Sequence, residues 1–201
     1  MLYFIRSFCR NLVLFLFVSV LVWTSCKNND YTPKPRGYFR ITLPSKEYRM
    51  LDSIFPYTFN YPVYCKILPD AQSPQETNWI NLQFTGFRGV LHLSYKPVQN
   101  NSNLSQYIED SRILAFKHIP KASMIEQIQV QYPENKVYGL IYVIKGQGAA
   151  SPYQFYITDS LHHFMRGALY FDASPNSDSL KPVIDFVRKD IDHLIETVKW
   201  K

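Results

Sequence analysis

Hydrophobic and polar positions alternate through much of the sequence between residues 38 and 172, with the period of two that half-buried strands produce. In residues 89–98, Leu91, Leu93 and Tyr95 share one side, and the residues between them share the other. This alternation predicts strands at Tyr38–Leu43, Phe55–Tyr64, Trp79–Phe84, Gly89–Val98, Ile125–Tyr132, Val137–Lys145, Tyr153–Asp159 and His163–Asp172. Short links join the last four, which favours antiparallel pairing because parallel neighbours need a long crossover.

A helical period appears in the middle of the chain, where apolar residues recur at helical spacing from Leu104 to Ala115. Asn103 followed by Gln106 resembles a capping box, in which two side chains satisfy free backbone N–H groups at a helix start. Pro120 disfavours helical geometry in the residue before it. We therefore predict a helix that begins at Asn103 and ends near His118.

The C-terminal segment has the clearest helical pattern, with one apolar stripe opposite a charged side. The stripe consists of Leu180, Val183, Ile184, Val187, Ile191, Leu194, Ile195 and Val198. Ser177, Asp178 and Ser179 are candidate caps, and Pro182 is expected in the first turn, where a proline is tolerated. One stripe facing one sheet surface predicts that this helix closes the core.

The predicted elements define an α+β fold, a mostly antiparallel sheet with a middle helix and a long C-terminal helix packed on it. Their order along the chain is similar to that of the PsbP/Mog1-type sandwich. This similarity is one of pattern and implies nothing about activity.

The N-terminus has the pattern of a bacterial lipoprotein signal peptide. Arg6 and Arg10 precede the apolar stretch 11–23, which is shorter than the roughly 20 residues that a spanning helix needs. Small residues then lead to Cys26, the expected site of cleavage and of lipid attachment, with acyl chains such as palmitate. Trp23 departs from the usual leucine, and the alternative is an uncleaved anchor helix. Both place the domain outside the cytoplasm.

The division of the chain follows from this signal. Residues 1–25 are the predicted signal peptide, and residues 26–36 are a lipidated tether that is polar and contains Pro33 and Pro35. Residues 37–201 are then a single α+β domain, a length that suits one core. The sequence after Cys26 only partly matches a surface-export signal, which favours a position that faces the periplasm, on the inner or the outer membrane.

Composition and charge narrow the function classes. The formal net charge is +6, but two of the arginines lie in the signal peptide and the rest of the excess is spread along the chain. Nucleic-acid binding is therefore not expected, because it needs clustered Lys and Arg within a recognised motif. The 15 Tyr and 14 Phe residues suit a sheet-rich domain with aromatic contact surfaces.

Few residues suggest chemistry, and we predict no enzyme, no cofactor and no metal site. Cys65 follows an aromatic run and is expected to be a buried core thiol. His162 and His163 follow Asp159 and Ser160, but consecutive strand residues face opposite sides, so both imidazoles cannot easily hold one metal. A hydrolase that uses one of these histidines remains an alternative.

Several long stretches, in order, resemble the family of gliding-motility-associated lipoproteins designated GldD. They are Tyr31–Ile41, Trp79–Phe84, Leu91–Pro97, Tyr107–His118, Thr158–Phe171 and Ser179–Lys201. The resemblance implies a non-enzymatic envelope component needed for gliding and associated with the type IX secretion machinery. It also implies envelope proteins of that machinery as partners, and it supplies no catalytic residues.

Our candidates for partner contact are Arg36, Tyr38, Arg40, Arg166 and Tyr170. The arginines suit bidentate contacts to carboxylates, although solvated or structural roles are the alternative. Tyr153 or Phe155 would add to a contact surface if either faced outward, and a helix layer would otherwise cover them. The competing function is a periplasmic binding module for a small apolar ligand or cell-wall fragment, which predicts a closed pocket.

Overall fold

The structure is a computed structural model that describes residues 41–52, 54–146, 148–172 and 177–201. Its helices are α2 (Asn101–Phe116) and α3 (Ser177–Thr197), with 3₁₀ turns η1 (Thr85–Phe87), η2 (Ile119–Lys121) and η3 (Pro133–Asn135). The strands are β1 (Tyr48–Met50), β2 (Tyr57–Thr58), β3 (Asn60–Pro62), β4 (Lys66–Pro69), β5 (Ile80–Phe84), β6 (Gly89–Pro97), β7 (Met124–Tyr132), β8 (Val137–Lys145), β9 (Tyr153–Thr158), β10 (His163–Phe171) and β11 (Lys199–Trp200).

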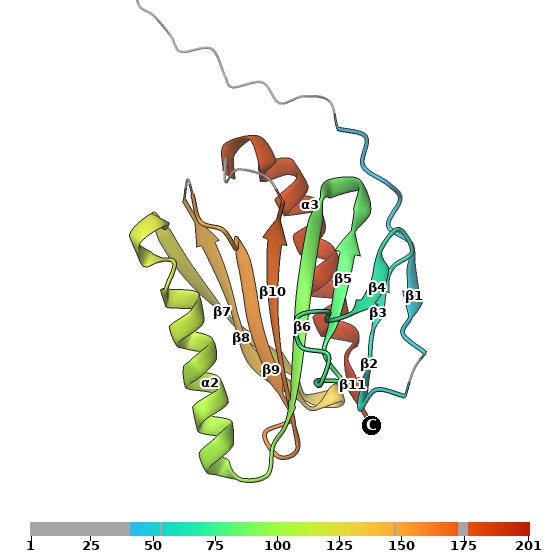
Figure 1. The fold of residues 1–201 in the computed structure, drawn as a ribbon, viewed down its shortest axis with the longest axis vertical. Coiled ribbons are helices and arrows are strands. Elements are labelled where there is room, and N and C mark those ends of the chain that lie inside the picture. The colour runs from blue at the N-terminus through green and yellow to red at the C-terminus, as the bar shows by residue number, and fades with distance from the viewer. Residues whose placement is uncertain (1–40, 53, 147, 173–176) are drawn as a thin grey trace, which may run out of the picture. The chain divides into compact units, whose positions relative to one another are not determined.

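A seven-stranded sheet in the order β4-β5-β6-β10-β9-β8-β7 organises the domain (Figure 1). All of its neighbouring strands pair antiparallel. Two small antiparallel pairs, β1 with β3 and β2 with β11, accompany it. The α+β class and the antiparallel sheet are therefore confirmed.

The larger hydrophobic core lies between the sheet and α3, which runs behind the sheet in Figure 1. The residues at every second position of the strands point into it, as Leu91, Leu93 and Tyr95 of β6 do. Val187 and Ile191 of α3 face these strands and are almost fully buried. At about 1.5–3 kcal/mol for each large apolar side chain fully buried, this layer is a main source of stability before entropy is subtracted.

The smaller core lies on the opposite face, under α2. Ala115 of α2 packs with Tyr142, Tyr156 and Phe164 of the sheet. Because α2 covers only part of this face, Tyr138 and Tyr170 stay 36% exposed at its open parts. Of the two alternatives for Tyr153 and Phe155, the structure shows the one in which a helix layer covers them, since both are 1% exposed on the α3 side.

Three local predictions need correction. Ile41 to Leu43 form no strand and are exposed, because their alternation has no partner strand and Pro44 follows at once; Tyr38 to Arg40 lie outside the described residues. The N-cap of the middle helix lies three residues earlier than expected, at Asn100 instead of Asn103, and Asn103 occupies N3. Pro182 lies inside α3 rather than in its first turn, since the helix begins at Ser177.

The aromatic stretch 55–64 also differs from the single predicted strand. It divides into β2 and β3, which pair with different partners, β11 and β1. Neither β4 nor β11 was predicted, because four and two residues are too short to show a period. Within the described part of the chain, no helix is long and apolar enough to cross a membrane.

Candidate functional site

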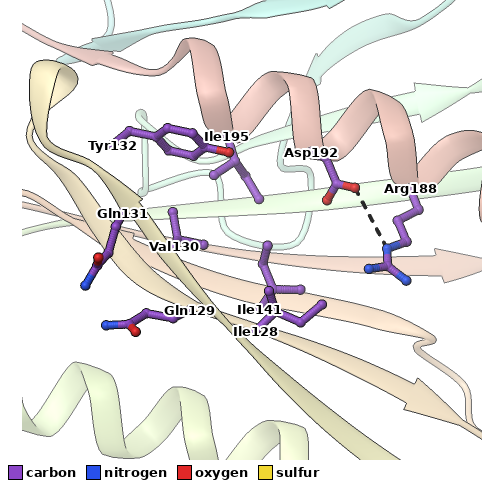
Figure 2. A pocket seen from close by; sticks show the side chains of 9 residues that line it. All are labelled: Ile128, Gln129, Val130, Gln131, Tyr132, Ile141, Arg188, Asp192 and Ile195. Carbon is purple, nitrogen blue, oxygen red and sulfur yellow. Dashed lines mark ion pairs between the residues drawn. The ribbon is translucent and has the colours of Figure 1, made fainter.

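The outer strand β7 borders an open groove of about 440 Å³ that lies between the sheet and α3 (Figure 2). Ile128, Val130 and Ile141 form its sheet wall. Figure 2 shows Gln129 and Gln131 extending to the other side of the strand, as alternate strand residues do. The groove therefore has an apolar wall beside a strand that has no outer neighbour among the described residues.

Charged side chains of α3 form the opposite wall of this groove. Arg188 Nε lies 3.8 Å from Asp192 Oδ2, the ion pair drawn in Figure 2. The Tyr153 hydroxyl also donates a hydrogen bond to Asp192. Tyr132 stands at one end, where burial, together with Glu196 and two further carboxylates, raises its pKa. This end of the groove is acidic.

A second groove, of about 400 Å³, continues along α3 toward the far end of β8. It shares Arg188 with the first, and Val143, Pro152 and Ile184 give it apolar walls. Lys145 and Lys181 line its far end. The two grooves together form one track between α3 and the β7–β8 edge. The track is acidic near Tyr132 and charge-balanced at its far end, where Lys145 is paired with Glu126 and Lys181 with Asp185.

The third groove lies on the other face, between α2 and strands β6 and β10, and measures about 380 Å³. Lys96, Lys117 and Arg166 line it with a single carboxylate, Asp110. The Lys96 ammonium sits 4.6 Å from the centroid of the Tyr107 ring. This groove therefore suits a group that carries negative charge.

Arg166 and Tyr170 lie on the α2 side of β10, and the structure brings them together. Arg166 donates to Gln154 Oε1 at 2.6 Å and also hydrogen-bonds Tyr170, while burial lowers its pKa. Its partners are a neutral amide and a phenol, and no carboxylate of the described residues forms an ion pair with it. Tyr170 adds an edge-to-face contact with His92 at 5.6 Å.

A buried carboxylate, Asp190 of α3, ties residues 46–64 to the core. Lys46 Nζ lies 2.6 Å from Asp190 Oδ1, and the hydroxyls of Tyr48 and Tyr64 both donate to the same carboxylate. Burial, followed by Asp190, raises the pKa of the neighbouring Cys65 thiol to about 12. Cys65 is thus an inert, 1% exposed core residue, as predicted.

The comparisons with known proteins place the chain. A family model described as "Gliding motility lipoprotein GldD" matches residues 28–200. The chain belongs to this GldD family. No curated protein matches it significantly. Among solved structures, the solution structure of cyanobacterial PsbP (CyanoP) from Synechocystis sp. PCC 6803 matches with a TM-score of 0.43 and 10% identity, over 81% of this chain and 98% of that chain.

Membership of the GldD family makes this chain a gliding-motility-associated lipoprotein. Cys26, Arg36, Tyr38 and Arg40 lie outside the described residues, so their predicted roles stay predictions. Of the predicted contact residues, Arg166 and Tyr170 are described, and they form one cluster.

The His162–His163 turn of this GldD-family chain is held by structural hydrogen bonds. Asp159 Oδ1 accepts the backbone N–H groups of Leu161, His162 and His163. His163 Nδ1 lies 2.9 Å from the Tyr95 hydroxyl, and its ring stacks on Trp200 at 5.1 Å. Among the residues that the structure covers, no three His, Cys, Asp or Glu side chains are grouped to hold a metal ion.

Sequence reasoning missed the Asp190 cluster and the β7 groove. A signal for Asp190 was present, because it follows Val187 by three residues and therefore falls on the apolar stripe of the C-terminal helix. The groove left no such signal, since it depends on which strand becomes the sheet edge.

Proposed function

We propose that this chain is a membrane-anchored envelope lipoprotein that supports gliding and the type IX secretion machinery through protein–protein contacts, without catalysis. The observation that carries the proposal is the family match over residues 28–200. The signal-peptide pattern before Cys26 supports a lipid anchor at that residue, on the periplasmic side of the inner or outer membrane.

The surfaces of the domain support a role in protein–protein contact rather than in catalysis. Arg166 is a half-buried guanidinium whose hydrogen-bond partners among the described residues are neutral, and Tyr170 lies beside it at 36% exposure. Arg and Tyr are the residue types that most often anchor protein interfaces. The three grooves are open at the surface, which does not favour the competing function of enclosing a small apolar ligand.

Site-directed photo-crosslinking in cells tests the proposal. A crosslinking amino acid replaces Tyr170 in one strain, and in a control strain it replaces Glu109, whose side chain is 51% exposed on α2. We expect the Tyr170 adducts to contain a component of the gliding or type IX secretion machinery, identified by mass spectrometry, and the Glu109 adducts to lack it. Adducts without any such component at Tyr170 would contradict the proposed contact.

A further inference from the structure

The two edges of the seven-stranded sheet differ in how they are protected. At one edge, β4 has only four residues and includes Lys66 and Pro69. A short strand, a lysine and a proline each discourage a further strand from pairing. At the other edge, β7 has nine residues and contains neither lysine nor proline. Its one charged residue, Glu126, already binds Lys145 at 3.0 Å. β7 is therefore a long edge, and no strand of the described residues pairs with the backbone groups on its outer side.

We propose that β7 pairs antiparallel with β7 of a second copy of this chain, about a twofold axis that passes through Gln129 normal to the sheet. The two seven-stranded sheets then form one continuous sheet with α3 of both copies on the same face. The interface is isologous, so each contact occurs twice. This inference stands independently of the proposed role in secretion.

The sequence of β7 is self-complementary in this register. Gln129 faces Gln129 of the second copy, and Gln127 faces Gln131, so amide groups that can donate and accept lie opposite each other. On the α3 side, Ile128 faces Val130. Shifting the axis by one residue to Ile128 instead sets Val130 opposite the Glu126 carboxylate and loses this match.

The groove beside β7 accommodates the added strand. Ile128 and Val130 of the second copy point toward α3, where the first copy's groove of about 440 Å³ has an apolar sheet wall. The Tyr132 hydroxyl faces Glu126 of the second copy and can donate to its carboxylate. Apolar surface that is open in one copy is thereby covered by the other.

The two ends of the track differ in charge. Glu134, Asp192 and Glu196 surround Tyr132 at one end of β7. At the other end, Lys145 is paired with Glu126 and Lys181 with Asp185, so this end is charge-balanced. An antiparallel second copy sets its charge-balanced end against the acidic end of the first, whereas a parallel second copy would set two acidic ends together. Repulsion between like charges therefore favours the antiparallel orientation.

Sedimentation measures the association directly. The protein is the mature chain, residues 26–201, with Cys26→Ser so that no lipid is attached. A nine-residue edge gives an interface at the small end of the stable range, so we expect a dimer with a dissociation constant on the order of 10 µM.

Gln129→Lys puts two like charges on the axis and should give a monomer. Gln106→Lys, the same change on exposed α2, should leave the dimer intact. A wild-type chain that stays monomeric well above 100 µM would overturn the proposal.

Disulfide trapping tests the register. The introduced cysteines lie at exposed positions, and the native Cys65 is buried and does not interfere. Gln129→Cys places two thiols directly opposite across the axis, within bridging reach. Two Gln127→Cys chains place theirs about 14 Å apart, so this variant should not crosslink alone but should pair with Gln131→Cys. Equal crosslinking of every single variant would overturn the register. Trapping of Gln129→Cys in cells on a different protein, without homodimer, would show another occupant and overturn the proposal.

Discussion

Three polar side chains of residues 46–64 converge on Asp190 of α3. Its carboxylate side chain is fully buried and binds Lys46, Tyr48 and Tyr64. Lys46 also lies 3.4 Å from the centroid of the Phe186 ring and donates to the Phe186 carbonyl. Because these partners lie far from α3 in the sequence, the carboxylate fastens the segment that follows the tether to the helix that closes the core.

Replacing Asp190 with Asn should reveal this role. The amide keeps the volume but loses the charge, so Lys46 and two phenols are left with a weaker acceptor, and we expect a loss of about 2–3 kcal/mol in the free energy of unfolding. Asp185→Asn is the matched control, because its pair with Lys181 is exposed and should contribute under about 1 kcal/mol. Urea unfolding measures both, and equal losses in the two variants would contradict the assigned role.

Three histidines make stability depend on pH. Burial lowers the pKa of His92, His118 and His163 below the ordinary value of 6.5. The unfolded chain therefore takes up protons at a higher pH than the folded one, so stability is full above about pH 7 and falls as the pH drops through 6.5. Urea unfolding from pH 7.5 to 5.5 should show this decline. His163→Gln should make the decline shallower, because it removes one of these three histidines. A flat profile would refute the account.

At the scale of residues, sequence reasoning found the buried Cys65 and the short link between the strands β9 and β10. It could not find the partners of Arg166, because Gln154 lies on a neighbouring strand and the pairing register sets their contact. It was also wrong about the cap of the middle helix. Asn100 and Asn103 form the box, and the Asn103–Gln106 pair merely has the same spacing.

A capping box fixes the start of α2. Asn100 Oδ1 accepts the Asn103 N–H at 3.0 Å, and Asn103 Oδ1 accepts the Asn100 N–H at 3.2 Å. Asn100→Ala should therefore cost about 1 kcal/mol of stability. Asn101→Ala, at an exposed position in the same turn, should be close to neutral or stabilising. Thermal unfolding compares them, and an Asn100→Ala protein as stable as the wild type would contradict the cap assignment.

Close backbone contact between β8 and β9 requires glycine at position 139. A Cβ atom there would lie 1.9 Å from the Tyr156 carbonyl oxygen, so the strands would have to separate. We expect Gly139→Ala to destabilise the protein by more than about 2 kcal/mol. Gly86→Ala should change little, because nothing lies within 4 Å of its added Cβ. Similar unfolding midpoints for the two variants would show that the strands adapt.

At the scale of elements, long periodic segments were predictable and short ones were not. The strands β5, β6 and β7 and the helix α3 each bury mainly one side, so their sequence period shows the face that packs on a core. The strand β9 is buried on both sides, between the two cores, and was predictable from its run of β-prone residues. Residues 41–43 have the same alternation but no partner strand, which only the assembled fold reveals. Strand β11 pairs with β2, far away in the chain, and two residues carry no pattern.

At the scale of the whole molecule, the α+β class followed from the order of elements along the chain. How the two helices cover the sheet could not be predicted in the same way. In the structure, α2 covers only part of one face of the sheet, and α3 packs on the other face. This arrangement leaves the Arg166–Tyr170 cluster and the β7 edge accessible, the two surfaces from which we argue contact with other proteins.

Conditional depletion tests the central claim, that this envelope lipoprotein supports secretion and gliding. Cells that lose the protein are followed for secreted cargo in the medium and for spreading of colonies, with retention of a periplasmic marker as the control for envelope integrity. We expect cargo to accumulate inside the cells and spreading to stop while the marker is retained. Normal cargo secretion after depletion would contradict the account.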